Sequence, residues 1–123
     1  MIVRDLRLRR NSDFERVRAR GRSWSNRRVV LSAMENGTAA NRYGFAVGKR
    51  IGGSVERNRA KRLLREAVRT IHPRLRQGFD IVVIARNSVG EETSSNEIQR
   101  DLEHLARRAG LLMGTTDEGG GRR

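Results

Sequence analysis

Apolar residues recur along the chain at spacings that alternate between helical and extended periods. The strongest helical stripe follows the Ile51-Gly52-Gly53 loop, with Ser54 as a suitable N-cap and His72-Pro73 as the closing signal. Its apolar members share one side of a helix and are Ala60, Leu63, Leu64, Ala67, Val68 and Ile71. Asn58, Arg62, Arg65 and Arg69 fall roughly opposite, flanked by Arg57 and Lys61.

Two shorter helices are indicated by capping-box spacing, a Ser followed three residues later by Glu. Ser12 and Glu15 predict a helix from about Asp13 to Arg20, ended by Gly21 in a left-handed conformation. Ser94 and Glu97 predict a last amphipathic helix that stops at Gly110. The first helix has few apolar positions, so it must pack on another element.

Three segments have the pattern of strands. Asn26 to Met34 is rich in β-forming residues, and Arg42 to Lys49 alternates; we expect these two to pair as a hairpin. Phe79 to Arg86 is continuously apolar and predicts a central strand buried on both faces. The alternating segment has Tyr43, Phe45 and Val47 on one face and small residues on the other. Either a helix or a ligand could lie against that bare face.

The predicted order is helix, two or three strands, helix, strand, helix, an α/β sandwich of the α+β two-layer type with a mixed sheet. A length of 123 residues suits one domain. We expect this domain to occupy residues 1–113. The remaining segment, 114–123, is too polar to bury a core and is expected to be disordered.

The charge of the chain limits further which classes of function the sequence is compatible with. The formal net charge is +13, and residues 1–76 hold 21 basic and 6 acidic side chains, whereas residues 77–123 hold 6 and 8. Such an excess usually serves an anionic partner. With 36% hydrophobic residues, the chain predicts a thin core and no deep pocket for a small substrate.

The segment from Arg57 to Arg65 gathers six polar or cationic side chains within about two and a half helical turns. This density suits phosphate oxygens of a folded polynucleotide, although a solvated helix face is the alternative. A basic helix beside a sheet favours RNA over DNA. Phe14 is a candidate for base stacking, with a core contact an equal possibility.

Other site types find little support. The chain has no Cys, and neither an apolar stretch of membrane-spanning length nor a signal peptide is evident, so a cytoplasmic protein is expected. His72 and His104 lack ligand-spaced partners, and Asp13, Asp80 and Asp101 are scattered. We therefore predict neither a catalytic residue nor a metal site in the polypeptide.

Residues Arg57 to Arg65 resemble the signature of the bacterial ribonuclease P protein family: Arg-Asn, two residues, Lys-Arg, two residues, Arg. Its five positions are filled by Arg57, Asn58, Lys61, Arg62 and Arg65. RLRRNSDFERV, Lys49-Arg50-Ile51-Gly52 and FDIVVIAR resemble further family blocks in the same order. The resemblance spans about residues 6–110. It implies one αβββαβα domain of the ribosomal-protein-like type, with a left-handed βαβ crossover.

The resemblance also implies a function, that of the non-catalytic subunit of an RNA-based endoribonuclease that removes the 5′ leader of precursor tRNA. Its partners would be the ribonuclease P RNA and that leader, with neither DNA nor membrane expected. The RNA subunit would use Mg²⁺ for the hydrolysis, and the protein alone would bind no cofactor. A structural ribosomal or RNA-assembly protein is the alternative, and a self-sufficient nuclease a remote third.

Site residues are carried over from the same resemblance. Those expected to bind the catalytic RNA are Lys49, Arg50, Arg57, Asn58, Arg59, Lys61, Arg62, Arg65 and Arg69. Those expected to form a cleft for the leader, between the first helix and the sheet, are Phe14, Arg18, Arg28, Ser32 and Ala46. Arg18 and Ser32 stand where relatives often have aromatic residues, which makes the leader contacts more dependent on charge.

Overall fold

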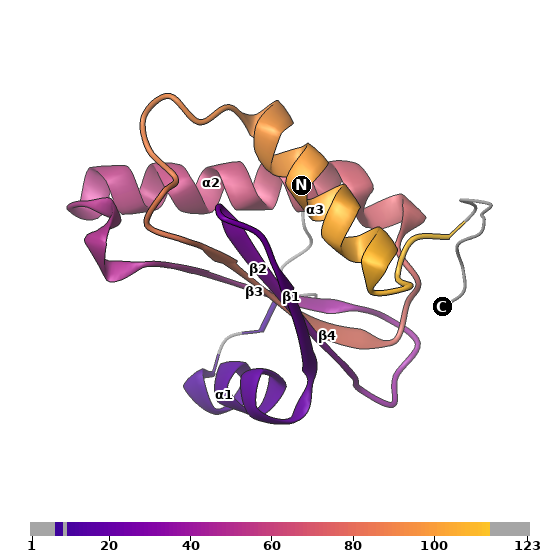
Figure 1. Ribbon diagram of the computed structural model, residues 1–123. Helices are drawn as coiled ribbons and strands as arrows, with labels where there is room; N and C mark the ends of the chain where they lie inside the picture. Colours follow the sequence, from indigo (N-terminus) through magenta and orange to yellow (C-terminus); the bar gives the residue numbers. More distant parts are fainter. Residues whose placement is uncertain (1–6, 9, 114–123) are drawn as a thin grey trace.

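A four-stranded mixed sheet separates one helix from two others in the computed structural model, which describes residues 7, 8 and 10–113 (Figure 1). Helix α1 covers one face of the sheet, and helices α2 and α3 cover the other. The elements in chain order are α1 (Asn11–Arg20), β1 (Arg22–Ser25), β2 (Val29–Glu35), β3 (Arg42–Val47), the 3₁₀ turn η2 (Lys49–Ile51), α2 (Ser54–Ile71), the 3₁₀ turn η3 (His72–Arg74), β4 (Phe79–Ala85) and α3 (Ser95–Arg108). The predicted α/β class with a mixed sheet and the αβββαβα order are confirmed. The predicted two layers are three, because helices cover both faces of the sheet.

The strands lie in the order β1-β2-β4-β3. Strand β4 is central, as predicted, and pairs antiparallel with β2 and parallel with β3. The expected hairpin between the second and third strands is wrong, because β4 lies between them. The hairpin instead joins β1 to β2. Parallel pairing of β3 with β4 requires a long crossover, and α2 supplies it.

Alternate residues of β4 divide the core between the two faces. Ile81 and Val83 pack under α2 and α3 in the larger core, whereas Val82 packs with Val17 of α1 in a smaller one. The stripe of α2 predicted to be apolar is largely buried, and its buried members are Ala60, Leu64, Ala67, Val68 and Ile71. Because that stripe faces the sheet, the cationic side of α2 faces outward.

The ends of α1 differ from the prediction. The helix begins at Asn11, its N-cap is Arg10, and no side chain caps it, so the expected Ser12–Glu15 capping box does not form. Gly21 has an extended backbone rather than a left-handed one. A Cβ there would lie 2.5 Å from the carbonyl oxygens of both Val17 and Ala33. Glycine therefore permits a close approach of backbones instead of a turn. At α3, by contrast, the Ser94–Glu97 capping box is present and Gly110 has φ of 75°, as predicted.

A buried carboxylate attaches α1 to the sheet. Asp80 of β4 is 1% exposed and accepts hydrogen bonds from Arg42 of β3, at 2.7 and 2.9 Å, and from Asn36 at 3.0 Å. Arg16 of α1 reaches the same carboxylate at 3.4 Å. Asp80 thus has a structural role.

None of the helices in the described ranges is long and apolar enough to cross a membrane.

Candidate nucleic-acid interface

The outer side of α2 carries cations that are available to a partner. Arg57, Asn58 and Arg62 are exposed, and Lys61 and Arg65 are half-buried. Among the described residues, no ion pair involves Arg57, Lys61, Arg62 or Arg65. Their charge is therefore not neutralised by a carboxylate of the described residues, which is the arrangement expected of a surface that binds phosphate.

Lys49 and Arg50 extend this surface beyond the start of α2. Both belong to η2 and are exposed. At the other end of the helix Arg69 is also exposed, but it pairs with Glu66 at 2.6 Å. We call Lys49, Arg50, Arg57, Asn58, Lys61, Arg62 and Arg65 the α2 surface.

Arg59 does not belong to the α2 surface, contrary to the prediction. Its guanidinium turns toward the loop between β4 and α3 and donates to three backbone carbonyls, of Gly90 at 2.9 Å, Glu91 at 2.8 Å and Thr93 at 3.0 Å. This loop has no regular backbone pairing of its own, so Arg59 supplies donors for its carbonyls. Its role in the structure is to hold the loop against α2.

A hollow of about 410 Å³ lies between α1, β3 and the first turns of α2. Its lining combines apolar side chains with cations of the α2 surface and consists of Leu8, Asn11, Phe14, Glu15, Phe45, Ala46, Val47, Arg57 and Lys61. Two groups of residues that the sequence assigned to separate sites, Phe14 with Ala46 and Arg57 with Lys61, therefore line one depression. We call it the β3 hollow.

Phe14 enters the β3 hollow because Gly44 leaves room for it. A Cβ on Gly44 would lie 2.6 Å from Cζ of Phe14, closer than real contacts allow. The phenyl ring thus rests directly on the β3 backbone, while the ring itself is only half-buried. Of the two alternatives for this face of β3, the helix is observed at Gly44, where Phe14 of α1 packs. The neighbouring Ala46 lines the open hollow.

Ser32 and Arg18 do not meet in this hollow as expected. Ser32 is 1% exposed, and its hydroxyl is 2.7 Å from that of Ser23 on the neighbouring β-strand. A direct contact between Ser32 and a bound RNA leader is therefore excluded in this structure. Arg18 is exposed in the last turn of α1.

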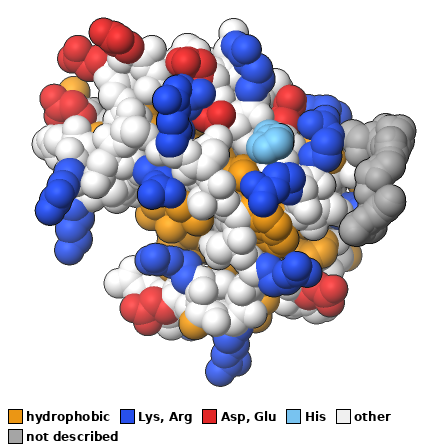
Figure 2. All heavy atoms as spheres, in the orientation of Figure 1, with side chains coloured by type: hydrophobic (Ala, Val, Ile, Leu, Met, Phe, Trp, Pro, Cys, Tyr) orange, Lys and Arg blue, Asp and Glu red, His pale blue; other side chains and the backbone are white. Residues whose placement is uncertain are grey.

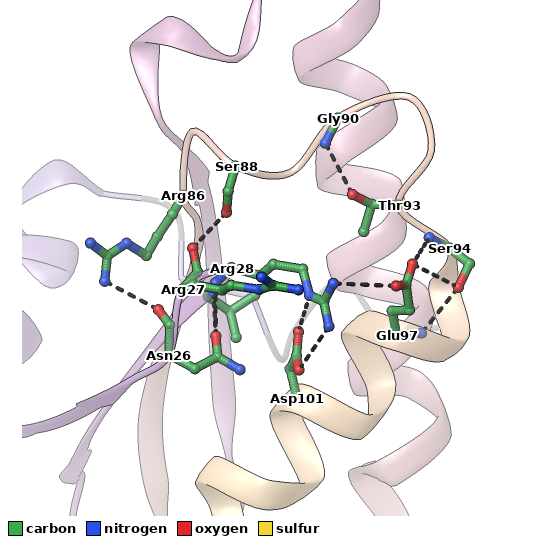
Figure 3. Close-up of polar contacts among 11 residues, drawn as sticks. Asn26, Arg27, Arg28, Arg86, Ser88, Gly90, Thr93, Ser94, Glu97 and Asp101 are labelled. Carbon is green, nitrogen blue, oxygen red and sulfur yellow. Dashed lines mark hydrogen bonds and ion pairs between the residues drawn. The ribbon is translucent and has the colours of Figure 1, made fainter.

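Arg28 lies on the other side of the sheet, so its assignment to the leader cleft is wrong. Figure 3 shows its guanidinium pointing to α3, where it donates to Asp101 at 2.7 Å and to Glu97 at 3.2 Å. The hydrogen bond to Asp101 is the main cause that raises the pKa of Arg28. Nearby, Ser88 donates to the Arg27 carbonyl and Arg86 to that of Asn26. These contacts attach the β1–β2 turn to the loop and helix that follow β4.

Charge is distributed unevenly in space as well as in sequence. On the face drawn in Figure 2, acidic side chains gather over the loop between β4 and α3, where Glu91 and Glu92 are exposed. Over the rest of that face Lys and Arg side chains are more numerous, with a few acidic side chains between them. A polyanion is therefore attracted to the α2 surface and the β3 hollow rather than to this loop.

Two titratable residues, His72 and Asp80, are engaged in hydrogen bonds within the fold. His72 Nδ1 is 2.6 Å from the Tyr43 hydroxyl, which also accepts a hydrogen bond from Asn41. Burial raises the pKa of Tyr43 to about 12. Over the described ranges, no three His, Cys, Asp or Glu side chains come together in a way that could hold a metal ion.

Five lining residues of the β3 hollow were not predicted: Leu8, Asn11, Glu15, Phe45 and Val47. The reason is that the segment before α1 runs beside β3, with the Leu8 N–H donating to the Tyr43 carbonyl at 2.7 Å. Phe45 and Val47 reach the hollow because β3 is at the edge of the sheet. Alternation in the sequence shows which face they share, but no local signal shows that their strand is an edge.

Known proteins resemble this chain over most of its length. The family model described as Ribonuclease P matches residues 2–110. The chain is 40% identical over 117 residues to a ribonuclease P protein component of Roseiflexus castenholzii, covering 95% of this chain and 96% of the relative. It is 46% identical over 108 residues to that of Symbiobacterium thermophilum, covering 87% and 93%.

Solved structures agree with the sequence comparison. The RNase P protein from Staphylococcus aureus superimposes with a TM-score of 0.77 at 32% identity, covering 87% of this chain and 97% of that one. For the RNase P protein from Thermotoga maritima the TM-score is 0.73 at 32% identity, with 80% and 93% covered.

Proposed function

The chain belongs to the ribonuclease P protein family and is the protein subunit of this tRNA-processing ribonucleoprotein; from that premise we propose which of its surfaces binds which RNA. The α2 surface binds the catalytic RNA, and the β3 hollow holds the single-stranded 5′ leader of precursor tRNA. The complex acts in the cytosol, where both RNAs are made. DNA is not a partner in this proposal.

One observation carries the proposal: Phe14 and Ala46 share the β3 hollow with Arg57 and Lys61. A single strand needs an aromatic or apolar platform for its bases and cations for its backbone, and this hollow offers both. Because Arg57 and Lys61 also belong to the α2 surface, a leader in the hollow lies next to the RNA bound on α2. The protein thereby positions the leader relative to the catalytic RNA.

The protein itself does not perform hydrolysis in this proposal. The RNA subunit holds the Mg²⁺ ions, which supply the activation of the attacking water and the charge stabilisation at the phosphate. Support comes from the engaged state of His72 and Asp80, whose hydrogen bonds serve the fold. In this proposal the polypeptide binds both RNAs.

Reconstitution tests the proposal. The protein is added to its cognate ribonuclease P RNA at low Mg²⁺, and cleavage is measured for one precursor tRNA with a leader of a single nucleotide and one with a leader of several nucleotides. We expect the protein to restore cleavage and to favour the substrate with the longer leader.

No stimulation at any Mg²⁺ concentration would support a purely structural RNA-assembly protein instead. Metal-dependent cleavage by the protein without RNA would support a self-sufficient nuclease. Equal stimulation for substrates with the short and the long leader would contradict the role of the β3 hollow but not that of the α2 surface.

A further inference from the structure

Arg7 lies beside β3, outside every set of residues that sequence reasoning assigned to RNA. Its backbone forms a parallel bridge with Tyr43, and the following residue, Leu8, donates its N–H to the Tyr43 carbonyl. These contacts fix the segment along the outer edge of the sheet. The Arg7 side chain is half-buried at that place.

A second guanidinium, that of Arg65, lies close to Arg7. Arg65 follows Lys61 by one turn of α2, and its guanidinium carbon is 5.8 Å from the centre of the Phe45 ring. Burial first, and then the positive charge of Arg7, lower the pKa of Arg65. Two like charges are thus held near one another at the β3 edge, which is unfavourable unless an anion joins them.

Both guanidiniums also have an unused donor. The Nε–H groups of Arg7 and Arg65 are buried and have no hydrogen-bond partner in the part of the chain that the structure describes. Leaving a buried donor unsatisfied is unfavourable. A guanidinium presents its N–H groups in a planar fork that matches the oxygens of a phosphate. One phosphate group between the two side chains would relieve the repulsion by accepting from their terminal N–H groups. The buried Nε–H groups would reach it only after the side chains turn toward the phosphate.

We propose that Arg7 and Arg65 together bind one backbone phosphate of an RNA strand at the edge of β3. The inference rests on the proposed function and extends it, because Arg7 joins the RNA-binding residues. The site continues the β3 hollow, since Leu8, Phe45 and Lys61 line that hollow and adjoin the two arginines in sequence or in space. The phosphate belongs either to the catalytic RNA or to the leader.

The test uses the full chain with Arg7→Met, Arg65→Met and both together, because Met retains an aliphatic stem without charge. Affinity is measured separately for the catalytic RNA and for a single-stranded leader oligonucleotide over a range of salt. Each single variant should weaken binding to one of them by about tenfold. The double variant should be little weaker than either single variant, since one phosphate is lost in every case. The slope of log affinity against log salt should fall by about 0.7–0.9.

Arg107→Met is the matched control, because Arg107 is exposed in the last turn of α3 and its loss changes the net charge equally. The RNA whose affinity falls identifies the source of the phosphate.

A second experiment uses an RNA with a single uncharged methylphosphonate at the contacted position. This RNA should bind the native protein more weakly than the unmodified RNA does, whereas Arg7→Met should bind the two RNAs equally. The midpoint of thermal unfolding without RNA should stay constant or rise in Arg7→Met, because a repulsion is removed.

The proposal is overturned if Arg7→Met affects affinity no more than Arg107→Met while Arg62→Ala still weakens RNA binding; the proposed function then stands. A fall in the unfolding midpoint with unchanged affinity would also overturn it and make Arg7 structural. Absence of RNA binding by the native protein would instead contradict the proposed function.

Discussion

At Gly44 a missing side chain determines where an aromatic ring lies. Phe14 occupies the space that a Cβ would take, which leaves the ring both packed on β3 and half-exposed to the β3 hollow. The same residue therefore contributes to the attachment of α1 and to the proposed leader site. A small residue on an edge strand lets a large side chain from a neighbouring element rest on the strand backbone.

Gly44→Ala should displace the Phe14 ring and lower the free energy of unfolding by about 1–3 kcal/mol, because the added methyl overpacks the contact. Urea denaturation measures this. Gly90→Ala is the control, since a Cβ at Gly90 has nothing within 4 Å. If the overlap is the cause, adding Phe14→Leu to Gly44→Ala should recover part of the loss; an equal effect of the two glycine variants would argue against it.

The free energy of unfolding depends on pH through the ionisation of Asp80. Burial by itself would raise its pKa, but hydrogen bonds from Arg42 and Asn36 outweigh burial and hold the pKa below its ordinary value. A lowered folded-state pKa means that the stabilisation is complete above the unfolded value of about 4 and is lost as pH falls through the folded value. Acidification below about pH 4 should therefore weaken the attachment of α1.

Asp80→Asn should cost about 1–3 kcal/mol at pH 7, since it weakens the hydrogen bonds from Arg42, while solvent screens the guanidinium charge that is left. The free energy of unfolding, measured from pH 7 to pH 3, should vary less in this variant than in the native protein. An unchanged pH profile would show that other carboxylates cause the acid sensitivity.

At the scale of elements, the two helices on the same face of the sheet begin differently. The side chain of Ser94 caps α3 by accepting from the Glu97 N–H, whereas α2 has Gly53 at its N-cap and no side-chain cap. Ser54, which the sequence suggested as a cap, is the first residue inside α2. The start of α2 relies on packing and on the η2 turn before it.

Ser94→Ala should therefore lower stability by about 1 kcal/mol, while Ser54→Ala should change it by a few tenths at most. The midpoints of chemical denaturation of the two variants give the comparison. Equal losses would mean that Ser54 has a capping role that the structure does not show.

Electrostatics acts at the scale of the whole molecule. The formal charge of +13 attracts any polyanion. The exposed Glu91 and Glu92 repel it from their loop, and the unpaired cations of α2 attract it to that helix. Local geometry, and not the total charge alone, should therefore decide where RNA binds.

A pair of double variants separates these effects. Arg57→Ala with Arg62→Ala should reduce the salt slope of RNA binding by about 1.4–1.8, as expected for two lost phosphate contacts. Arg107→Ala with Arg108→Ala removes the same charge from α3 and should change the slope much less. Equal reductions would show that net charge dominates and would contradict a defined α2 surface.

The sequence by itself determined the three helices, the strands β2, β3 and β4 and the outward face of α2, but its periodicity did not indicate the short strand β1. Periodicity fixes which side of a helix is apolar, so the exposure of Arg57, Asn58 and Arg62 followed from local spacing, and the apolar run of Phe79 to Arg86 identified the central strand. Only the tertiary structure decided the strand order, the engagement of Arg59 and Arg28 in internal contacts, and the approach of Arg7 to Arg65. Those depend on which segments meet across long separations in sequence, and the direction of a long side chain is set by the acceptors that folding brings within its reach.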